Sequence, residues 1–218
     1  MILPQSFYNR STLQVAQDLL GCFLVRKFNL PLLAKERAGA RYKIVETEAY
    51  NGPKDLASHA SRGLTPRNKI MFGKPGIIYV YFTYGMHYML NIVTEKENYP
   101  AAILIRALEL ATHNSQHITH NAPKANGPAK LTKHLKINKS SNGLPIYTKK
   151  HGLWIESRNT KIKPSQIKKT TRIGVDYAGK YKNKKWRFYI KDSKFISKKL
   201  KEEAALIHHD DEQLSPPL

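Results

Sequence analysis

The chain has 218 residues, with 37 Lys or Arg against 16 Asp or Glu, so its formal net charge is +21. A hydrophobic content of 41% supports a folded core, and the charge excess favours a polyanionic partner such as DNA, RNA or an anionic membrane surface. No apolar run reaches the roughly 18 residues of a membrane span, and the N-terminus lacks the pattern of a secretory signal. The single cysteine, Cys22, excludes an internal disulfide and a multi-cysteine zinc site.

The predicted elements mix strands and helices without regular alternation. In chain order we expect a helix over 11–20, strands over 22–28 and 41–50, two strands joined by a turn at Tyr84-Gly85 within 76–94, a strand over 101–108 that passes into a helix through Leu110, a loop over 112–126, a helix over 129–135 and a strand over 186–190. This order favours one α+β domain over 1–200, with a curved, mainly antiparallel sheet flanked by helices. An acidic segment, 201–218, is expected to be a disordered tail.

The segment VETEAY, which ends at Tyr50, combines two acids with a tyrosine inside this basic chain. Because strand side chains alternate between faces, Glu46, Glu48 and Tyr50 share one face. An exposed edge strand with both acids in solvent is one interpretation. A buried pocket in which a carboxylate deprotonates water is the other, and the surrounding positive charge favours it. The alternation of strand side chains does not show which of the two glutamates would deprotonate the water.

A turn at 51–53 is expected to bring His59 back towards the end of this strand. A metal site can be drawn from four residues, namely Glu46, Glu48, Asp55 and His59. Their spacing matches no strong zinc pattern, so no metal is expected.

Tyrosines gather in the following apolar stretch. Tyr79 and Tyr81 share a strand face, and Tyr84 lies at the expected turn, where its ring can protrude. Because aromatic rings serve as stacking platforms for bases, Tyr50, Tyr81 and His59 can sandwich a flat ring, and Tyr84 can enter a duplex. Three nearby cations are available for phosphates: Arg67, Lys69 and Lys74. A second basic region, 161–201, contains fifteen Lys or Arg with interleaved aromatic residues, which is typical of a nucleic-acid surface.

Short motifs along nearly the whole chain resemble one family. In order they are VETEAY, GPKD, SH, TPRN, MFGKPG, YVYFTYGMHYMLNIV, ILIRALE, GPAKL, INKS and RIGVDYAG…WRFYI, from about Phe7 to Ile196. Together they resemble the alkyladenine (3-methyladenine) DNA glycosylase family. The segment from Leu108 to Gly127 matches poorly, so the resemblance assigns it no DNA contacts.

The resemblance implies a monofunctional enzyme of base-excision repair. Such an enzyme flips a damaged purine (3-methyladenine, hypoxanthine or ethenoadenine) out of double-stranded DNA and hydrolyses its N-glycosidic bond, which leaves an abasic site. It implies no cofactor and no metal, and a monomer as the working form. The expected location is the cytoplasm, with the nucleoid, in a bacterium and the nucleus in a eukaryote.

The resemblance also implies roles for residues at matching positions. Glu48 is the general base for water, and Arg106 helps to hold that water. Asn91 rejects normal guanine. The remaining roles are Tyr50, His59 and Tyr81 in the base pocket, Tyr84 as the intercalating finger with Met86 beside it, and Lys130 as a contact of the DNA backbone. Arg67, one of the three cations noted above, is a second expected backbone contact.

Two other functions fit parts of the sequence. A metal-dependent nuclease would use Glu46, Glu48 and Asp55 around a divalent ion. A non-enzymatic DNA- or RNA-binding protein would need the basic surface alone. The ordered set of motifs favours the glycosylase over both.

Overall fold

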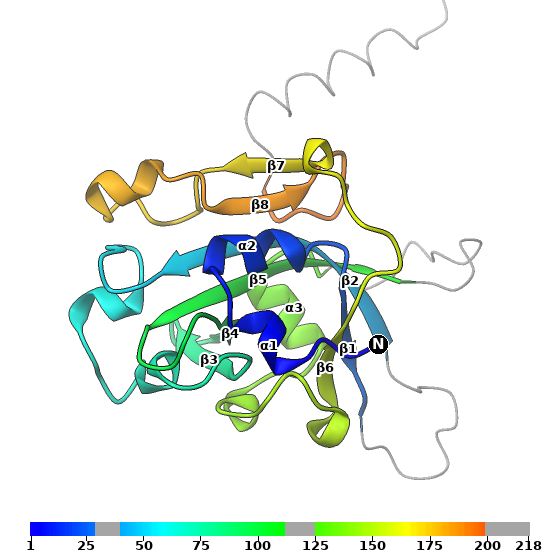
Figure 1. Ribbon diagram of the computed structural model, residues 1–218, viewed down its shortest axis with the longest axis horizontal. Coiled ribbons are helices and arrows are strands. Elements are labelled where there is room, and N and C mark those ends of the chain that lie inside the picture. Colours follow the sequence, from blue (N-terminus) through cyan, green and yellow to red (C-terminus); the bar gives the residue numbers. More distant parts are fainter. Residues whose placement is uncertain (29–39, 112–124, 199–218) are drawn as a thin grey trace, which may run out of the picture.

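The computed structural model describes residues 1–28, 40–111 and 125–198 (Figure 1). The strands are β1 (Phe23–Arg26), β2 (Ala40–Asn51), β3 (Ile78–Thr83), β4 (His87–Val93), β5 (Ala101–Leu110), β6 (Leu153–Glu156), β7 (Ile167–Thr170) and β8 (Arg187–Ile190). The α-helices are α1 (Gln5–Tyr8), α2 (Thr12–Asp18) and α3 (Pro128–His134). Single 3-10 turns lie at His59–Arg62, Lys69–Phe72, Lys139–Ser141, Lys149–His151, Pro164–Gln166 and Gly179–Asn183.

All eight strands join one open antiparallel sheet, which confirms the predicted α+β class. The strand order is β3-β4-β5-β2-β1-β6, and β8 pairs with both β2 and β7. The long strand β2 pairs with β5 along one edge. Along its other edge it pairs first with β1 and then, from Glu46 to Glu48, with β8. Figure 1 shows β7 and β8 together at one end of the molecule, beside α2.

The register between β2 and β5 is interrupted twice at the site. Ile44 lies opposite Leu108, but Glu46 lies opposite Ala107, so Val45 has no partner in the register. The next pair after Glu46 and Ala107 joins Thr47 to Ile105, so Arg106 is skipped on β5. Such irregularities turn side chains away from strict alternation and are frequent beside active sites. Here they place Arg106 next to the two glutamates of β2.

Helix α2 buries the opposite face of β2. The hydroxyl of Thr47 donates to the carbonyl oxygen of Ala16 in α2, at 2.9 Å. Ala16 and Ala49 both belong to the main hydrophobic core. Helix α3 packs on β4 and β5, where the Thr132 hydroxyl donates to the Tyr88 carbonyl oxygen at 2.8 Å. The face of β2 that carries Glu46, Glu48 and Tyr50 is therefore left for the site.

Most expected elements are present with shifted ends, and four differences remain. The predicted passage into a helix at Leu110 is wrong, because β5 continues to pair with β2 as far as Leu110. The sequence did not predict α1, β6 and β7, each of which has only four residues. Within the parts of the chain that the structure describes, no helix is long and apolar enough to cross a membrane. The tail over 201–218 and most of the loop over 112–126 lie outside those parts.

Candidate active site

A cavity of about 320 Å³ opens on one face of four neighbouring strands. Each strand contributes alternate side chains to it, as the pleat of a sheet requires. They are Tyr79 and Tyr81 from β3, Met89 and Asn91 from β4, Ala102 and Leu104 from β5, and Tyr50 from β2. Segments after the strands close its rim, with Ser58 and His59 on one side and residues 173–175 on another.

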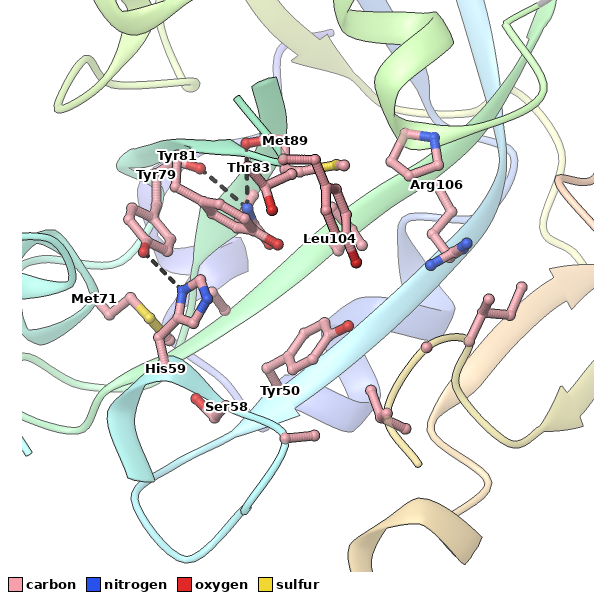
Figure 2. Close-up of a pocket in the computed structure, with 18 of the residues that line it drawn as sticks. Tyr50, Ser58, His59, Met71, Tyr79, Tyr81, Thr83, Met89, Leu104 and Arg106 are labelled. Atoms are coloured by element: carbon pink, nitrogen blue, oxygen red, sulfur yellow. Dashed lines mark hydrogen bonds between the residues drawn. The ribbon is translucent and has the colours of Figure 1, made fainter. Parts of the chain in front are cut away.

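The walls of the cavity are aromatic (Figure 2). The ring of His59 packs edge-on against Tyr81, with 4.6 Å between ring centroids, and Tyr79 lies 5.5 Å from Tyr81. Figure 2 shows Tyr50 standing apart from these three rings, with the cavity between them. The arrangement leaves room for a flat ring between Tyr50 on one side and Tyr81 with His59 on the other.

Glu48 lies behind this cavity and is fully buried. Its Oε2 accepts hydrogen bonds from the Tyr50 hydroxyl at 2.9 Å and from Arg106 Nη1 at 3.0 Å. Its Oε1 accepts from the backbone N–H of Ile173 at 2.8 Å. Burial, followed by the Glu48 charge, raises the pKa of Tyr50 well above its usual value, so the hydroxyl stays a donor. Both lone pairs of Oε2 are thus used, whereas Oε1 keeps one lone pair for a further donor.

Arg106 joins the two glutamates of β2. Its Nη1 bonds to Glu48, and its Nε lies 3.5 Å from Glu46 Oε1. Burial by itself lowers the pKa of Arg106, but the Glu48 and Glu46 carboxylates outweigh burial and raise that pKa. Arg106 also lines the cavity. Arg106 therefore contacts both the buried Glu48 carboxylate and the cavity.

Both carboxylate oxygens of Glu46 accept hydrogen bonds from neighbouring groups. Its Oε1 accepts from Arg187 Nε at 2.6 Å and from the Ser197 hydroxyl at 2.9 Å. Its Oε2 accepts from the backbone N–H of Ser197 at 2.6 Å. The Ser197 hydroxyl in turn accepts from Arg106 Nε at 3.3 Å. Glu46 therefore anchors Arg106 and the segment around Ser197, whereas Glu48 adjoins the cavity.

His59 is a neutral member of the wall. Burial first, and then the charges of Arg67 and Arg62, lower the pKa of His59 from 6.5 to about 4. Its Nδ1 lies 2.9 Å from the Tyr79 hydroxyl, and burial raises the pKa of Tyr79 to about 12. Both rings are therefore uncharged near neutral pH and present hydrogen-bonding groups, rather than a formal charge, to a ligand.

The low pKa of His59 predicts a pH dependence of stability. Between about pH 4 and 6.5 the unfolded chain binds the proton and the folded chain does not, so the free energy of unfolding falls as the pH falls through this range. We expect this loss to be about 1–2 kcal/mol smaller in His59→Gln when urea unfolding is compared at about pH 7.5 and pH 5. The same pH dependence of stability in wild type and in His59→Gln would contradict the lowered pKa of His59.

Asn91 is fixed in one orientation on the cavity floor. Its amide nitrogen donates to the carbonyl oxygens of Tyr79, at 3.2 Å, and Met89, at 3.3 Å. Because a side-chain amide has only two N–H groups, both are used and the nitrogen is identified by its two acceptors. Asn91 is buried and lines the cavity.

Tyr84 lies at the tip of the turn between β3 and β4, beside the cavity. Its side chain is 83% exposed, and its φ is 52°, in the left-handed region that a bulky residue rarely adopts. Met86, on the same turn, is also exposed. An aromatic ring that is held in solvent on a strained turn gains nothing for the fold, which is typical of a functional residue.

The two expected backbone contacts have different surroundings. Lys130, near the start of α3, is exposed, and its Nζ bonds to the side-chain oxygen of Asn126 at 3.3 Å. Arg67 donates to the Phe82 carbonyl oxygen at 2.9 Å, and its guanidinium lies 5.3 Å from the centroid of the Tyr81 ring. Arg67 thus touches the outer side of the pocket wall as well as solvent.

Asp55 belongs to a different cluster from the glutamates. Both of its carboxylate oxygens accept from Arg172, at 2.6 and 2.8 Å, and both side chains are fully buried. In the described residues, no group of three or more His, Cys, Asp or Glu side chains is placed to hold a metal ion. Of the four residues considered for a metal site, Glu46 and Glu48 share Arg106, Asp55 pairs with Arg172, and His59 bonds to Tyr79.

The segment 172–177 lies in the basic region 161–201, but the sequence predicted no role in the pocket for any of its residues. It supplies the Ile173 N–H that bonds to Glu48, the Arg172 that holds Asp55, and Tyr177 at the rim of the cavity. Only the motif RIGVDY could have drawn attention to this segment. A hydrogen bond from a backbone N–H can be made by almost any residue type, so the sequence does not reveal it.

Known proteins match this chain over most of its length. The family model described as methylpurine-DNA glycosylase matches residues 6–194. A protein of Methanocella arvoryzae is 44% identical over 91% of this chain and 96% of its own length. One of Carboxydothermus hydrogenoformans is 46% identical over 91% of this chain and its full length, and one of Legionella pneumophila is 43% identical over 90% and 98%. All three are named, provisionally, as 3-methyladenine DNA glycosylases. As its motifs predicted, the chain belongs to the methylpurine-DNA glycosylase family of DNA N-glycosylases.

Proposed function

We propose that the protein flips a damaged purine out of double-stranded DNA and hydrolyses its N-glycosidic bond with a water molecule activated by Glu48. The observation that carries the proposal is the buried Glu48 carboxylate, held by Arg106 and the Ile173 N–H beside a cavity with aromatic walls. The substrates that suit such a cavity are modified or deaminated purines of the 3-methyladenine, hypoxanthine and ethenoadenine class.

The chemistry follows from the position of Glu48. Departure of the base builds positive charge on C1′ of the sugar, as in other glycoside cleavages. Water donates a proton to Glu48 while its oxygen bonds to C1′, and the electrons of the broken C–N bond leave with the base. Arg106 holds the fully buried Glu48 carboxylate in place through the 3.0 Å bond.

The composition of the cavity favours hydrolysis over attack by an amine. An enzyme that also cuts the DNA backbone uses an amine to form a Schiff base with the sugar. Of the described residues that line the cavity, none is a lysine. We therefore infer a monofunctional glycosylase that leaves an abasic site.

Tyr84 has the exposure expected of a finger that fills the stack vacated by the flipped base. Stacking on an aromatic side chain contributes about 1–3 kcal/mol per base. For Tyr84→Ala we expect lesion-specific affinity to fall about 5- to 100-fold, and affinity for undamaged DNA to stay close to wild type. Tyr84→Phe, which keeps the ring, should bind like wild type in the same fluorescence-anisotropy titration. An equal loss for damaged and undamaged duplexes would instead indicate a structural role.

Single-turnover excision from duplexes that carry hypoxanthine, ethenoadenine or 3-methyladenine tests the proposal. Heat or alkali then converts abasic sites into strand breaks that a gel resolves. Activity should persist in a chelator, which a metal-dependent nuclease would not survive. If the wild-type protein released none of the three bases, the proposal would be wrong.

The working form and location are part of the same proposal. We infer that residues 1–200 act as one glycosylase domain, as a monomer, because one chain supplies both walls of the cavity and its acid. The protein would act in the compartment that holds chromosomal DNA, which is the nucleoid-containing cytoplasm of a bacterium or the nucleus of a eukaryote.

A further inference from the structure

The loop between Ile173 and Trp186 begins and ends on the strand that carries the buried acid. At its start the N–H of Ile173 donates to the Glu48 carboxylate at 2.8 Å. At its end the carbonyl oxygen of Trp186 accepts from the N–H of Ala49 at 2.9 Å. Both ends of the loop are therefore fixed to consecutive residues of β2. Whatever the middle of the loop contacts is held at a set position relative to Glu48.

The middle of this loop packs against the site through an aromatic side chain. Tyr181 lies against Trp186, with 6.0 Å between ring centroids, and its carbonyl oxygen accepts from Arg172 Nη2 at 3.4 Å. Tyr181 also packs against the same small hydrophobic cluster as Tyr50, the wall of the base pocket. The loop thus has one side that faces the pocket wall and another that is left to solvent.

The side left to solvent carries a lysine cluster. Its exposed members are Lys180, Lys182, Lys184 and Lys185. The segment 177–185 contains no acid, and none of the four lysines forms an ion pair with an acid in the described parts of the chain. Lys184 alone lies near a ring, 6.0 Å from the centroid of Trp186. Like charges this close repel one another in the free protein, and a polyanion relieves that repulsion.

The lysine cluster lies beside the mouth of the base pocket and not in it. Tyr177, near the start of the same loop, lines the pocket and is 71% exposed, whereas none of the four lysines is among the described lining residues. Figure 1 shows the turn Gly179–Asn183 (orange) beyond the end of β2, on the side away from β3 and β4, whose turn carries Tyr84. A duplex that meets Tyr84 at the lesion therefore reaches the lysine cluster only with the part to one side of the lesion.

We propose that the lysine cluster binds the phosphate backbone of intact duplex DNA on one side of the lesion. Phosphate contacts position a protein on a duplex without reading its sequence, so the cluster serves damaged and undamaged DNA alike. Because the loop is fixed to β2 at both ends, these contacts also position Glu48 relative to the strand. The inference rests on the proposed action on double-stranded DNA and adds to it a binding surface outside the base pocket.

The first test measures how DNA affinity depends on salt. Each phosphate that a lysine neutralises releases counterions, so its loss reduces the slope of log affinity against log salt concentration by about 0.9. For the double variant Lys180→Gln, Lys182→Gln we expect the slope on an undamaged duplex to fall by about 2 in magnitude. Fluorescence anisotropy at several salt concentrations gives the slope. Both side chains are exposed, so their replacement leaves the core intact, and urea unfolding checks this.

The matched control is the double variant Lys149→Gln, Lys150→Gln. These exposed lysines also lie in a 3-10 turn, Lys149–His151, and their replacement changes the net charge by the same amount. The turn precedes β6, which Figure 1 shows towards the end of the molecule opposite β7 and β8. It supplies no residue to the described lining of the base pocket. The salt slope of this control should equal that of wild type.

The second test asks whether the contact lies on one side of the lesion only. Two hypoxanthine duplexes are compared with a longer one, the first shortened 5′ of the lesion and the second shortened 3′ of it. A 2′-fluorine on the lesion nucleotide disfavours positive charge on the sugar and so prevents hydrolysis. Shortening the side that reaches the lysine cluster should weaken binding by wild type more than binding by Lys180→Gln, Lys182→Gln. Shortening the other side should weaken both proteins by the same factor.

Three results would overturn the inference. They are an unchanged salt slope in Lys180→Gln, Lys182→Gln, an equal fall of the slope in Lys149→Gln, Lys150→Gln, and losses on shortening that are the same for wild type and the first variant on both sides. All are binding measurements, so they are separate from the excision assay. If wild type released no base while the slope still fell, the proposed function would fail alone. If excision occurred and the slope did not fall, only the role of the lysine cluster would fail.

Discussion

Replacing Glu48 with glutamine is expected to slow base excision by about 10²- to 10⁴-fold, the usual contribution of a general base. The amide has nearly the shape of the carboxylate and can still accept from the Ile173 N–H. It cannot take a proton from water at neutral pH, and it offers Arg106 no negative charge. The rate is measured under single-turnover conditions on a hypoxanthine duplex, with enzyme in excess.

The matched control is Glu109→Gln. Glu109 pairs with Lys43 at the partly exposed end of β5, 2.6 Å from its ammonium nitrogen, and has no contact with the cavity. Its replacement should leave the excision rate within about twofold of wild type, because a surface ion pair contributes little. Lesion binding by Glu48→Gln should persist. An unchanged excision rate in Glu48→Gln would remove Glu48 from the mechanism.

Replacing Asp55 with alanine is expected to lower the free energy of unfolding by about 3–5 kcal/mol, the cost of leaving one member of a buried ion pair without its partner. Arg172 would keep a fully buried charge, with only backbone carbonyl groups as acceptors. Asp55 also accepts from the backbone N–H groups of Asn51 and Ala57, each at 3.1 Å. The turn after β2 would therefore lose its fixed shape.

Urea unfolding at neutral pH measures this loss, and Asp18→Ala is its control. Asp18 pairs with Arg10 at 3.0 Å, but both side chains are partly exposed, so its loss should cost at most about 1 kcal/mol. If Asp55→Ala lost no more stability than Asp18→Ala, the Arg172 pair would be unimportant for the fold. The dependence of the free energy of unfolding on urea concentration should be unchanged if the native state stays compact.

Much of the site follows from the alternation of strand side chains. Parity alone places Glu46, Glu48 and Tyr50 on one face, and the structure brings all three to Arg106 or its partners. The family resemblance, and not the alternation of side chains, identified Glu48 as the expected general base. In the structure the two acids have different neighbours, because Glu46 contacts Ser197 and Glu48 contacts Tyr50. The roles themselves remain predictions until Glu48→Gln is measured.

What the sequence could not predict depends on backbone geometry. The interrupted register that brings Arg106 to both glutamates involves Val45, whose residue type gives no sign of it. The N–H of Ile173 reaches Glu48 across 125 positions of the chain. Strands β6 and β7 were missed because four residues are too few for a periodic pattern, and the two central residues of β7, Lys168 and Lys169, are exposed lysines.

The contact between Glu46 and Ser197 has a consequence for the order in which the molecule is made. The two residues are 151 positions apart, so the ribosome must synthesise most of the chain before they can meet. Until then the carboxylate has no backbone N–H from Ser197, and Arg106 lacks the hydroxyl beside it. A nascent chain can therefore expose its basic residues to nucleic acid well before it holds a finished acid centre. Hydrolytic competence is expected to arise late in synthesis.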